Sequence, residues 1–198
     1  MKVYTFPKSR SLRVLWVLEE LRLDYETVRV DLLAAAPTVS SPHPQHKVPV
    51  LDDEGFLIFE SAAICKYLCA KTAGQRLYPA ELRANAGVEQ WLSFTLTELE
   101  PPLWALLKHT VLLPDARKVA AVAEVARQEA DVAITCLARQ PFAPWITGET
   151  FTLADIFTAQ NLMWATACGI SLPPALEAYL QRCQAREAYQ RAVMRNNG

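Results

Sequence analysis

Residues 46–68, HKVPVLDDEGFLIFESAAICKYL, are the most informative stretch for the fold class, because they combine the pattern of a β-hairpin with that of the start of a helix. Two short apolar runs flank the acidic turn Asp52–Gly55, a pattern typical of antiparallel strands joined by a tight turn. After the second run, apolar residues recur at helical spacing from Ile64 onward. We therefore expect strand, turn, strand and helix in this order.

Upstream of this stretch, the pattern predicts a β-α-β unit. Residues 2–6 have the character of a short strand, and residues 11–23 carry a broad apolar face at helical spacing. The β-branched and aromatic residues at 25–30 predict a second strand, parallel to the first. Residues 34–47 are rich in Pro, Ser, Ala and His, which indicates a long loop with at most one helical turn.

Downstream of residue 79, strand signals nearly vanish and Ala, Leu, Glu and Arg dominate. Prolines and glycines separate four expected helices, at residues 82–110, 115–138, 152–168 and 173–194. This shift in composition predicts two domains, 1–77 and 84–198. Within the helical part, Thr152 and Asp155 form a capping box that starts a helix, with Phe151 and Ile156 as its hydrophobic staple.

The composition excludes several classes of protein. Apolar residues make up 52% of the 198 residues, which excludes disorder. With 20 basic and 21 acidic side chains and a formal net charge of −1, the chain lacks the basic surface that nucleic acid requires. No apolar run is long enough to cross a membrane, and the first residues are too short an apolar stretch for a signal peptide. We therefore expect no nucleic-acid or membrane partner and a cytoplasmic location, with the five cysteines reduced.

The segment between the first strand and the first helix is a candidate catalytic site. The first turn of a helix presents unpaired N–H groups and the positive end of the helix dipole, so it stabilises an anion such as a thiolate. Ser9 or Ser11 could donate a hydrogen bond to that anion, which would lower the pKa of a thiol further. The alternative is that the two serines only cap the helix, and taken alone the motif favours capping.

Two further pairs are candidates for ligand binding. Pro49 directly before a strand leaves the backbone of Val48 free to pair with an extended, peptide-like ligand. Glu60 and Ser61 open the next helix, where they can hold an ammonium and a carboxylate. An ordinary turn proline and a capping serine are the structural alternatives.

Neither the cysteines nor the histidines form a pattern for a metal. Cys65 and Cys69 lie four residues apart on one helix face, but no His or acidic residue joins them at a suitable spacing. The histidines, His43, His46 and His109, are too scattered for a metal site or a triad. We expect buried core thiols and no metal.

Three segments occur in an order and spacing that resemble the cytosolic glutathione transferases: SRSLRVLWVLEEL at 9–21, residues 46–68, and ITGETFTLADIF at 146–157. The first of them resembles the serine-bearing bacterial and fungal branches of that family. The resemblance implies an α/β thioredoxin-like N-terminal domain of order β-α-β-α-β-β-α, followed by an all-helical C-terminal bundle. It also implies a homodimer, with a glutathione site in each N-terminal domain and a co-substrate pocket against the helical domain.

The resemblance also assigns roles to individual residues. It places the catalytic hydroxyl on Ser9 or Ser11, with Ser9 preferred, and Arg10 is the alternative group that would stabilise the thiolate. For glutathione it implies three contacts. The backbone of Val48, before a cis Pro49, would bind the cysteinyl part, and Glu60 and Ser61 would bind the γ-glutamyl end. Lys47, with His46, would bind the glycyl carboxylate.

The function expected from this resemblance is that of a glutathione S-transferase, an enzyme of detoxification. It would bind glutathione, lower its thiol pKa and direct the thiolate onto a small hydrophobic electrophile or a peroxide, with no cofactor beyond glutathione as co-substrate. One alternative is a glutathione-dependent isomerase or dehalogenase that uses the same thiolate. Another is a non-catalytic module of this fold that binds apolar ligands or a protein partner.

Overall fold

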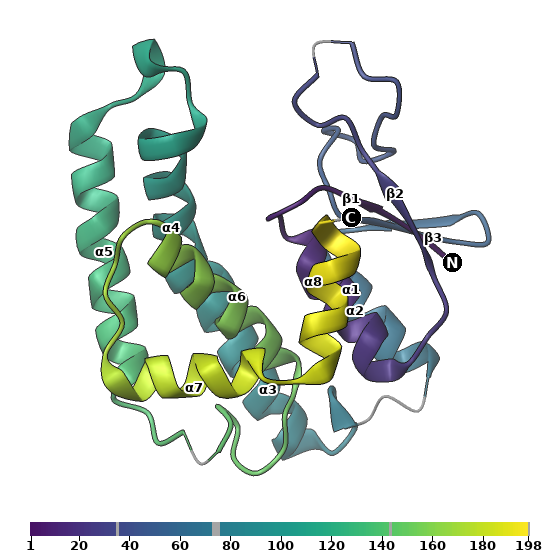
Figure 1. The fold of residues 1–198 in the computed structure, drawn as a ribbon. Coiled ribbons are helices and arrows are strands. Elements are labelled where there is room, and N and C mark those ends of the chain that lie inside the picture. The colour runs from purple at the N-terminus through teal and green to yellow at the C-terminus, as the bar shows by residue number, and fades with distance from the viewer. Residues whose placement is uncertain (35, 73–75, 143, 198) are drawn as a thin grey trace. The chain divides into compact units, whose positions relative to one another are not determined.

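The computed structural model describes residues 1–34, 36–72, 76–142 and 144–197. The chain divides into two compact units, drawn together in Figure 1. One unit comprises Met1–Pro79 with Gln184–Gly198, and the other comprises Ala80–Cys183. All the strands of the described residues belong to the first unit, and the second is helical.

A sheet of four strands forms the centre of the first unit. The strands are β1 (Lys2–Thr5), β2 (Glu26–Arg29), β3 (Val50–Asp53) and β4 (Phe56–Phe59). They are ordered β2-β1-β3-β4, with β1 and β2 parallel and the other two pairs antiparallel. The predicted β-α-β unit and the predicted hairpin are therefore both present.

The hairpin turn depends on residues in a left-handed backbone conformation. Glu54 and Gly55 have φ values of +56° and +94°, as expected for a two-residue turn that matches the twist of the flanking strands. The carboxylate of Asp52 accepts a hydrogen bond of 2.7 Å from the backbone N–H of Gly55. The turn thus places β4 directly beside β3.

Helices α1 (Ser11–Leu21) and α2 (Ser61–Lys71) supply most of the remaining core of this unit. Every residue of α1 from Ser11 to Leu18 is buried, and Trp16 has no exposed surface. Ile64, Cys65 and Leu68 of α2 also have no exposed surface. The broad apolar face predicted for residues 11–23 thus packs in the core.

The expected element order differs from the observed one between β2 and β3. The resemblance implies a helix in this stretch, but its described residues form turns and bends instead. Pro37, Pro42 and Pro44 lack a backbone N–H, so they cannot propagate helical hydrogen bonds here. The fold class itself is the one expected.

The last helix, α8 (Glu187–Asn197), belongs to the first unit and lies alongside α1 (Figure 1). The sequence predicts one helix over 173–194, whereas the structure has α7 (Pro174–Gln184) and then α8. No Gly or Pro marks this break. The break accompanies a bidentate ion pair in which the guanidinium of Arg186 contacts the carboxylate of Glu20 at 2.6 and 2.7 Å.

The second unit contains the remaining helices. They are α3 (Leu82–Phe94), α4 (Glu100–Leu107), α5 (Ala120–Ala138), α6 (Leu153–Ala167) and α7. Two π-helical segments, η2 (Thr95–Leu99) and η3 (Lys108–Leu112), extend the run that begins with α3, so helical structure continues from Leu82 to Leu112. Pro101 lacks the N–H that would bond to the carbonyl four residues earlier, which accounts for the widened turn of η2 just before it.

The predicted capping box at the start of α6 is present. The Thr152 side chain pairs with the backbone of Asp155, and the carboxylate of Asp155 accepts the backbone N–H of Thr152 at 2.8 Å. Phe151 and Ile156, the predicted staple residues, are 6% and 0% exposed. This motif is structural, as the sequence analysis expects.

The two compact units do not follow the boundaries of the predicted domains, because α8 groups with the sheet rather than with the other helices. The assignment of 1–77 and 84–198 as domains stays a prediction. In the described part of the chain, none of the helices is both long and apolar enough to span a membrane.

Candidate functional site

The three candidate motifs meet at one end of the sheet. The register pairs Tyr4 of β1 with Val50 of β3, and Val50 with Phe59 of β4. Consequently the segment that follows β1, the segment that precedes β3 and the segment that follows β4 all leave the sheet at the same end. They carry the serine motif, the Val-Pro pair and the Glu-Ser pair, respectively.

At the start of α1, the two candidate serines bond to each other and to the backbone. The Ser9 hydroxyl lies 2.6 Å from the carbonyl oxygen of Phe6 and 2.9 Å from the Ser11 hydroxyl, and it accepts the backbone N–H of Ser11 at 3.1 Å. Ser11 has no exposed surface, whereas Ser9 and Arg10 are half-buried. Of the two hydroxyls, that of Ser9 is therefore the one within reach of a ligand.

The Val48–Pro49 peptide bond is cis. Pro49 is buried and Val48 is half-buried, while Lys47 and His46 are exposed just before them. The Lys47 carbonyl accepts a hydrogen bond from the Ser41 hydroxyl, which fixes the backbone ahead of the cis bond. The Lys47 ammonium and the His46 ring thus remain on the surface beside the Val-Pro pair.

Glu60 and Ser61 stand at the N-terminus of α2. Glu60 has a left-handed φ of +69°, and its side chain is 74% exposed. Ser61 is only 5% exposed. The first turn of α2 contributes N–H groups that lack partners within the helix, so this corner favours a carboxylate beside an ammonium acceptor.

Arg13 is a neighbour of this corner that the sequence reasoning missed. It lies on α1 with no exposed surface, and its guanidinium donates a hydrogen bond of 3.3 Å to the hydroxyl oxygen of Ser61. Since the Ser61 oxygen accepts this bond, the Ser61 hydroxyl hydrogen is available to an anion. The signal in the sequence is an arginine inside the apolar run of the first helix.

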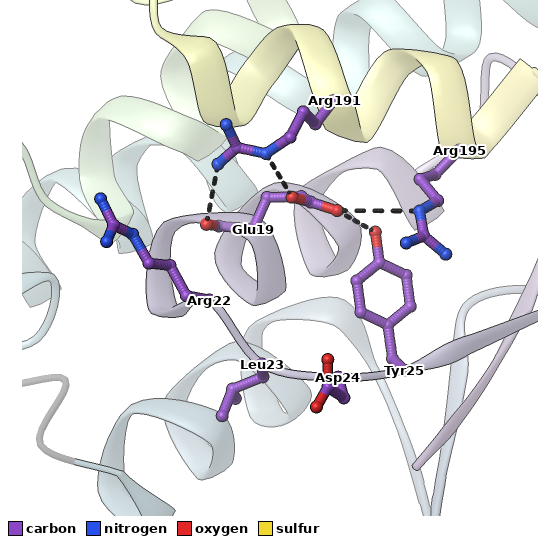
Figure 2. Close-up of a pocket in the computed structure, with 7 residues that line it drawn as sticks. All are labelled: Glu19, Arg22, Leu23, Asp24, Tyr25, Arg191 and Arg195. Carbon is purple, nitrogen blue, oxygen red and sulfur yellow. Dashed lines mark hydrogen bonds and ion pairs between the residues drawn. The ribbon is translucent and has the colours of Figure 1, made fainter.

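Away from these motifs, a cavity of about 380 Å³ lies at the other end of α1. Figure 2 shows its lining, which comprises Glu19, Arg22, Leu23, Asp24, Tyr25, Arg191 and Arg195. None of the candidate site residues lines it.

The ionic groups of this cavity bond to one another. The carboxylate of Glu19 accepts hydrogen bonds of 2.7 Å from both Arg191 and Tyr25. Partial burial opposes ionisation of Glu19, but these bonds outweigh it and lower the pKa of its carboxyl. The Arg195 guanidinium lies over the Tyr25 ring, 5.0 Å from its centroid. The cluster thus joins α8 to α1.

The cysteines of α2 are core residues, as the sequence predicts. Cys65 and Cys69 are 0% and 3% exposed, and burial raises the pKa of both thiols, that of Cys69 to about 12. Over the residues that the structure describes, no three His, Cys, Asp or Glu side chains gather as metal ligands would.

Comparison with known proteins identifies the family. The description "Glutathione S-transferase, N-terminal domain" matches residues 1–70, and "Glutathione S-transferase, C-terminal domain" matches residues 118–182. Glutathione S-transferase 1 of Manduca sexta is 32% identical over 96% of this chain and 91% of its own length. The chain therefore belongs to the glutathione S-transferase family.

Solved structures agree with this assignment. A ternary complex of BphK, a bacterial glutathione transferase, has a TM-score of 0.88 at 29% identity, with full coverage of both chains. The theta-class enzyme of Xanthomonas axonopodis pv. citri, solved with glutathione bound, has a TM-score of 0.79 at 28% identity, covering 98% of this chain and 96% of its own. The resemblance and the fold class predicted from the sequence are thereby confirmed, while the serine-bearing branch stays a prediction.

Proposed function

We propose that this protein is a glutathione S-transferase that activates the thiol of glutathione for attack on small hydrophobic electrophiles or peroxides. The observation that carries the proposal is the strand register, which brings the start of α1, the cis Val48–Pro49 bond and the start of α2 to one end of the sheet. Each motif alone has a structural explanation. Their convergence is what a tripeptide with two carboxylates, an ammonium and a thiol requires.

In this proposal the γ-glutamyl end of glutathione binds at the start of α2. Glu60 accepts the ammonium, and the Ser61 hydroxyl with the helix N-terminus holds the carboxylate. The bond that Arg13 donates to the Ser61 oxygen supports this, because it turns the hydroxyl into a donor.

The rest of the tripeptide runs along the segment before β3. The backbone of Val48, fixed by Pro49, pairs with the cysteinyl residue in the manner of an added strand. The exposed Lys47, with His46, attracts the glycyl carboxylate. These contacts bring the sulfur toward the start of α1.

The start of α1 then stabilises the thiolate. The dipole of α1 and a hydrogen bond from the Ser9 hydroxyl are the proposed means, with Arg10 as an additional permanent cation and Ser11 as the partner that orients Ser9. In substitution, the thiolate electron pair forms the carbon–sulfur bond while the leaving group departs with its bonding pair. Because the reactive sulfur arrives with the substrate, the protein supplies ionisation and proximity.

One observation favours a second candidate, a non-catalytic glutathione-binding module. The Ser9 hydroxyl lies 2.6 Å from the Phe6 carbonyl, so in this state the protein's own backbone takes its hydrogen. Activation by Ser9 requires that this hydrogen turn from Phe6 to the incoming sulfur. A glutathione-dependent isomerase or dehalogenase would need the same rotation of the Ser9 hydroxyl.

Membership of the family supports three further parts of the proposal: a homodimeric state, a cytoplasmic location and a role in detoxification.

The test replaces Ser9 by Ala and compares this variant with Ser11→Ala, which removes only the partner that orients Ser9, and with the double variant, which removes both hydroxyls. A hydrogen bond to a charged group contributes about 1.5–3 kcal/mol, so Ser9→Ala should lower kcat/KM for a chromogenic aryl halide about tenfold to a hundredfold. The pKa of bound glutathione, followed by thiolate absorbance, should rise in parallel. Glutathione affinity, measured by calorimetry at a pH at which the bound thiol is protonated, should stay within about twofold, since Ser9 stabilises only the ionised sulfur.

Two results would contradict parts of the proposal. Unchanged turnover in the double variant would remove the hydroxyl mechanism and leave Arg10 and the helix dipole. Glutathione binding by the wild-type protein without turnover of any electrophile would establish the non-catalytic module.

A further inference from the structure

His43 is a buried histidine in the segment before Val48. Its side chain is 7% exposed, and its ring packs edge-on against Phe59, with the ring centroids 4.9 Å apart. Its Nδ1 accepts the backbone N–H of Gln45 at 2.9 Å, and its own backbone N–H donates to the Ser41 hydroxyl at 3.2 Å. The imidazole is therefore held in place by the protein itself.

The bonding of Nδ1 determines what His43 presents to Glu60. Since Nδ1 accepts a hydrogen bond, Nε2 carries a hydrogen. Nε2 lies 3.8 Å from Oε1 of Glu60, at the end of the sheet where the three motifs meet. This separation exceeds a hydrogen bond, so the interaction is an electrostatic attraction between the N–H dipole and the carboxylate.

Glu60 needs such a partner. Its side chain is 74% exposed, so without a fixed neighbour the carboxylate samples many rotamers and must be ordered when a ligand binds. A carboxylate has two oxygens and about four lone-pair sites, so one oxygen can face His43 while the other accepts an ammonium. A rigid histidine beside Glu60 thus reduces the ordering that ligand binding requires.

We propose that His43 is a positioning residue that orients Glu60 toward the ammonium of the γ-glutamyl end of glutathione. This inference rests on the proposed function, because it assigns the ammonium to Glu60. His43 acts through Glu60 and makes no contact of its own with the ligand.

Two variants separate the contacts of His43. Asparagine places an acceptor near the position of Nδ1, which preserves the bond to Gln45, but its side chain ends short of Glu60. Glutamine places an N–H near the position of Nε2 and loses the acceptor at Nδ1. Binding is measured by calorimetry with glutathione and with glutaryl-cysteinylglycine, which lacks only the α-amino group.

The expected result depends on the ligand. His43→Asn should weaken glutathione binding about threefold to tenfold and leave the affinity for glutaryl-cysteinylglycine unchanged. His43→Gln should restore most of the lost glutathione affinity. In a Glu60→Gln background, His43→Asn should have no further effect, because the carboxylate that it positions is gone.

Three results would overturn the inference. An equal loss for both ligands would mean that His43 only supports its loop, and tighter glutathione binding in His43→Asn would mean that it competes with the ammonium. Wild-type protein that binds neither ligand would overturn the proposed function and this inference together. If His43→Asn does not fold, His43→Phe, which keeps a ring against Phe59 and lacks both nitrogens, takes its place in the same comparison.

Discussion

Replacing Asp155 by Ala should be among the most destabilising single substitutions in the helical unit. Asp155 has no exposed surface, and its carboxylate accepts four hydrogen bonds. One oxygen accepts the Ile146 backbone N–H at 2.9 Å and the Tyr179 hydroxyl at 2.8 Å. The other accepts the Thr152 backbone N–H at 2.8 Å and the Thr152 hydroxyl at 3.2 Å.

The magnitude follows from the donors that lose their acceptor. Asp155→Ala leaves three buried donors without their acceptor: the backbone N–H groups of Ile146 and Thr152, and the Tyr179 hydroxyl. A buried donor without an acceptor costs about 1–3 kcal/mol, so we expect about 3–9 kcal/mol for these three donors. A whole domain is typically stable by only about 5–15 kcal/mol. Burial raises the pKa of the Asp155 carboxyl and the bonds from Ile146, Thr152 and Tyr179 oppose that rise, so the carboxylate depends on its donors.

Two milder variants provide the controls. Asp155→Asn keeps one acceptor oxygen but turns an NH₂ toward one pair of donors, for an expected loss of about 2–4 kcal/mol. Tyr179→Phe removes the hydrogen bond that the Tyr179 hydroxyl donates to Asp155 and should cost about 1–2 kcal/mol.

Urea unfolding followed by circular dichroism measures all three variants, together with Asp155→Asn/Tyr179→Phe. The two changes share one carboxylate, so the double variant should lose less than the sum of the single losses. A loss below about 1 kcal/mol for Asp155→Ala, or strict additivity in the double variant, would show that these hydrogen bonds do not stabilise the helical unit as expected.

Two further predictions concern the hairpin and its acidic neighbour. Gly55→Ala should destabilise the protein by about 1 kcal/mol, because Gly55 has a φ of +94°; no atom lies near the position of the added Cβ, so the cost is backbone strain alone. Gly87→Ala, within α3 and equally open, should stabilise the protein by about 0.5–1 kcal/mol. A higher melting temperature for Gly55→Ala than for Gly87→Ala would contradict both expectations. Hydrogen bonds from Lys71 and Tyr67 lower the pKa of the Asp53 carboxyl in the folded protein. The stability that this carboxylate contributes should be complete above the unfolded-state pKa of about 3.9 and should fall as the pH drops toward the lower folded pKa. The difference in unfolding free energy between wild type and Asp53→Asn should therefore shrink below about pH 4, and a constant difference down to pH 3 would contradict this prediction.

The fold was predictable where local signals were strong. The hairpin turn, the apolar face of α1 and the capping box at Thr152 each depend on a few residues close together in the sequence, and the structure contains all three. The break between α7 and α8 had no such signal, since no Gly or Pro lies there. It accompanies ion pairs between Arg186 and Glu20 and between Arg191 and Glu19, which join residues more than 160 positions apart.

The candidate site likewise contains residues that the sequence predicts and residues that it does not. The sequence indicated the serine, Val-Pro and Glu-Ser motifs, because a helix start or a proline before a strand can be recognised locally. It did not indicate Arg13 behind Ser61 or His43 beside Glu60, because these pairs form only when separate segments pack together.

The sequence alone predicts that this chain combines a thioredoxin-like sheet with a helical unit, and it indicates which short motifs are candidates to bind an anion or a peptide. Three further features appear only after folding: those motifs share one end of the sheet, Ser11 is buried while Ser9 is within reach of a ligand, and α8 packs with α1. This difference arises because turns, caps and amphipathic periods depend on residues that are close together in the sequence. Burial and the partners of a buried charge are set by segments that are distant in the chain and adjacent only after folding.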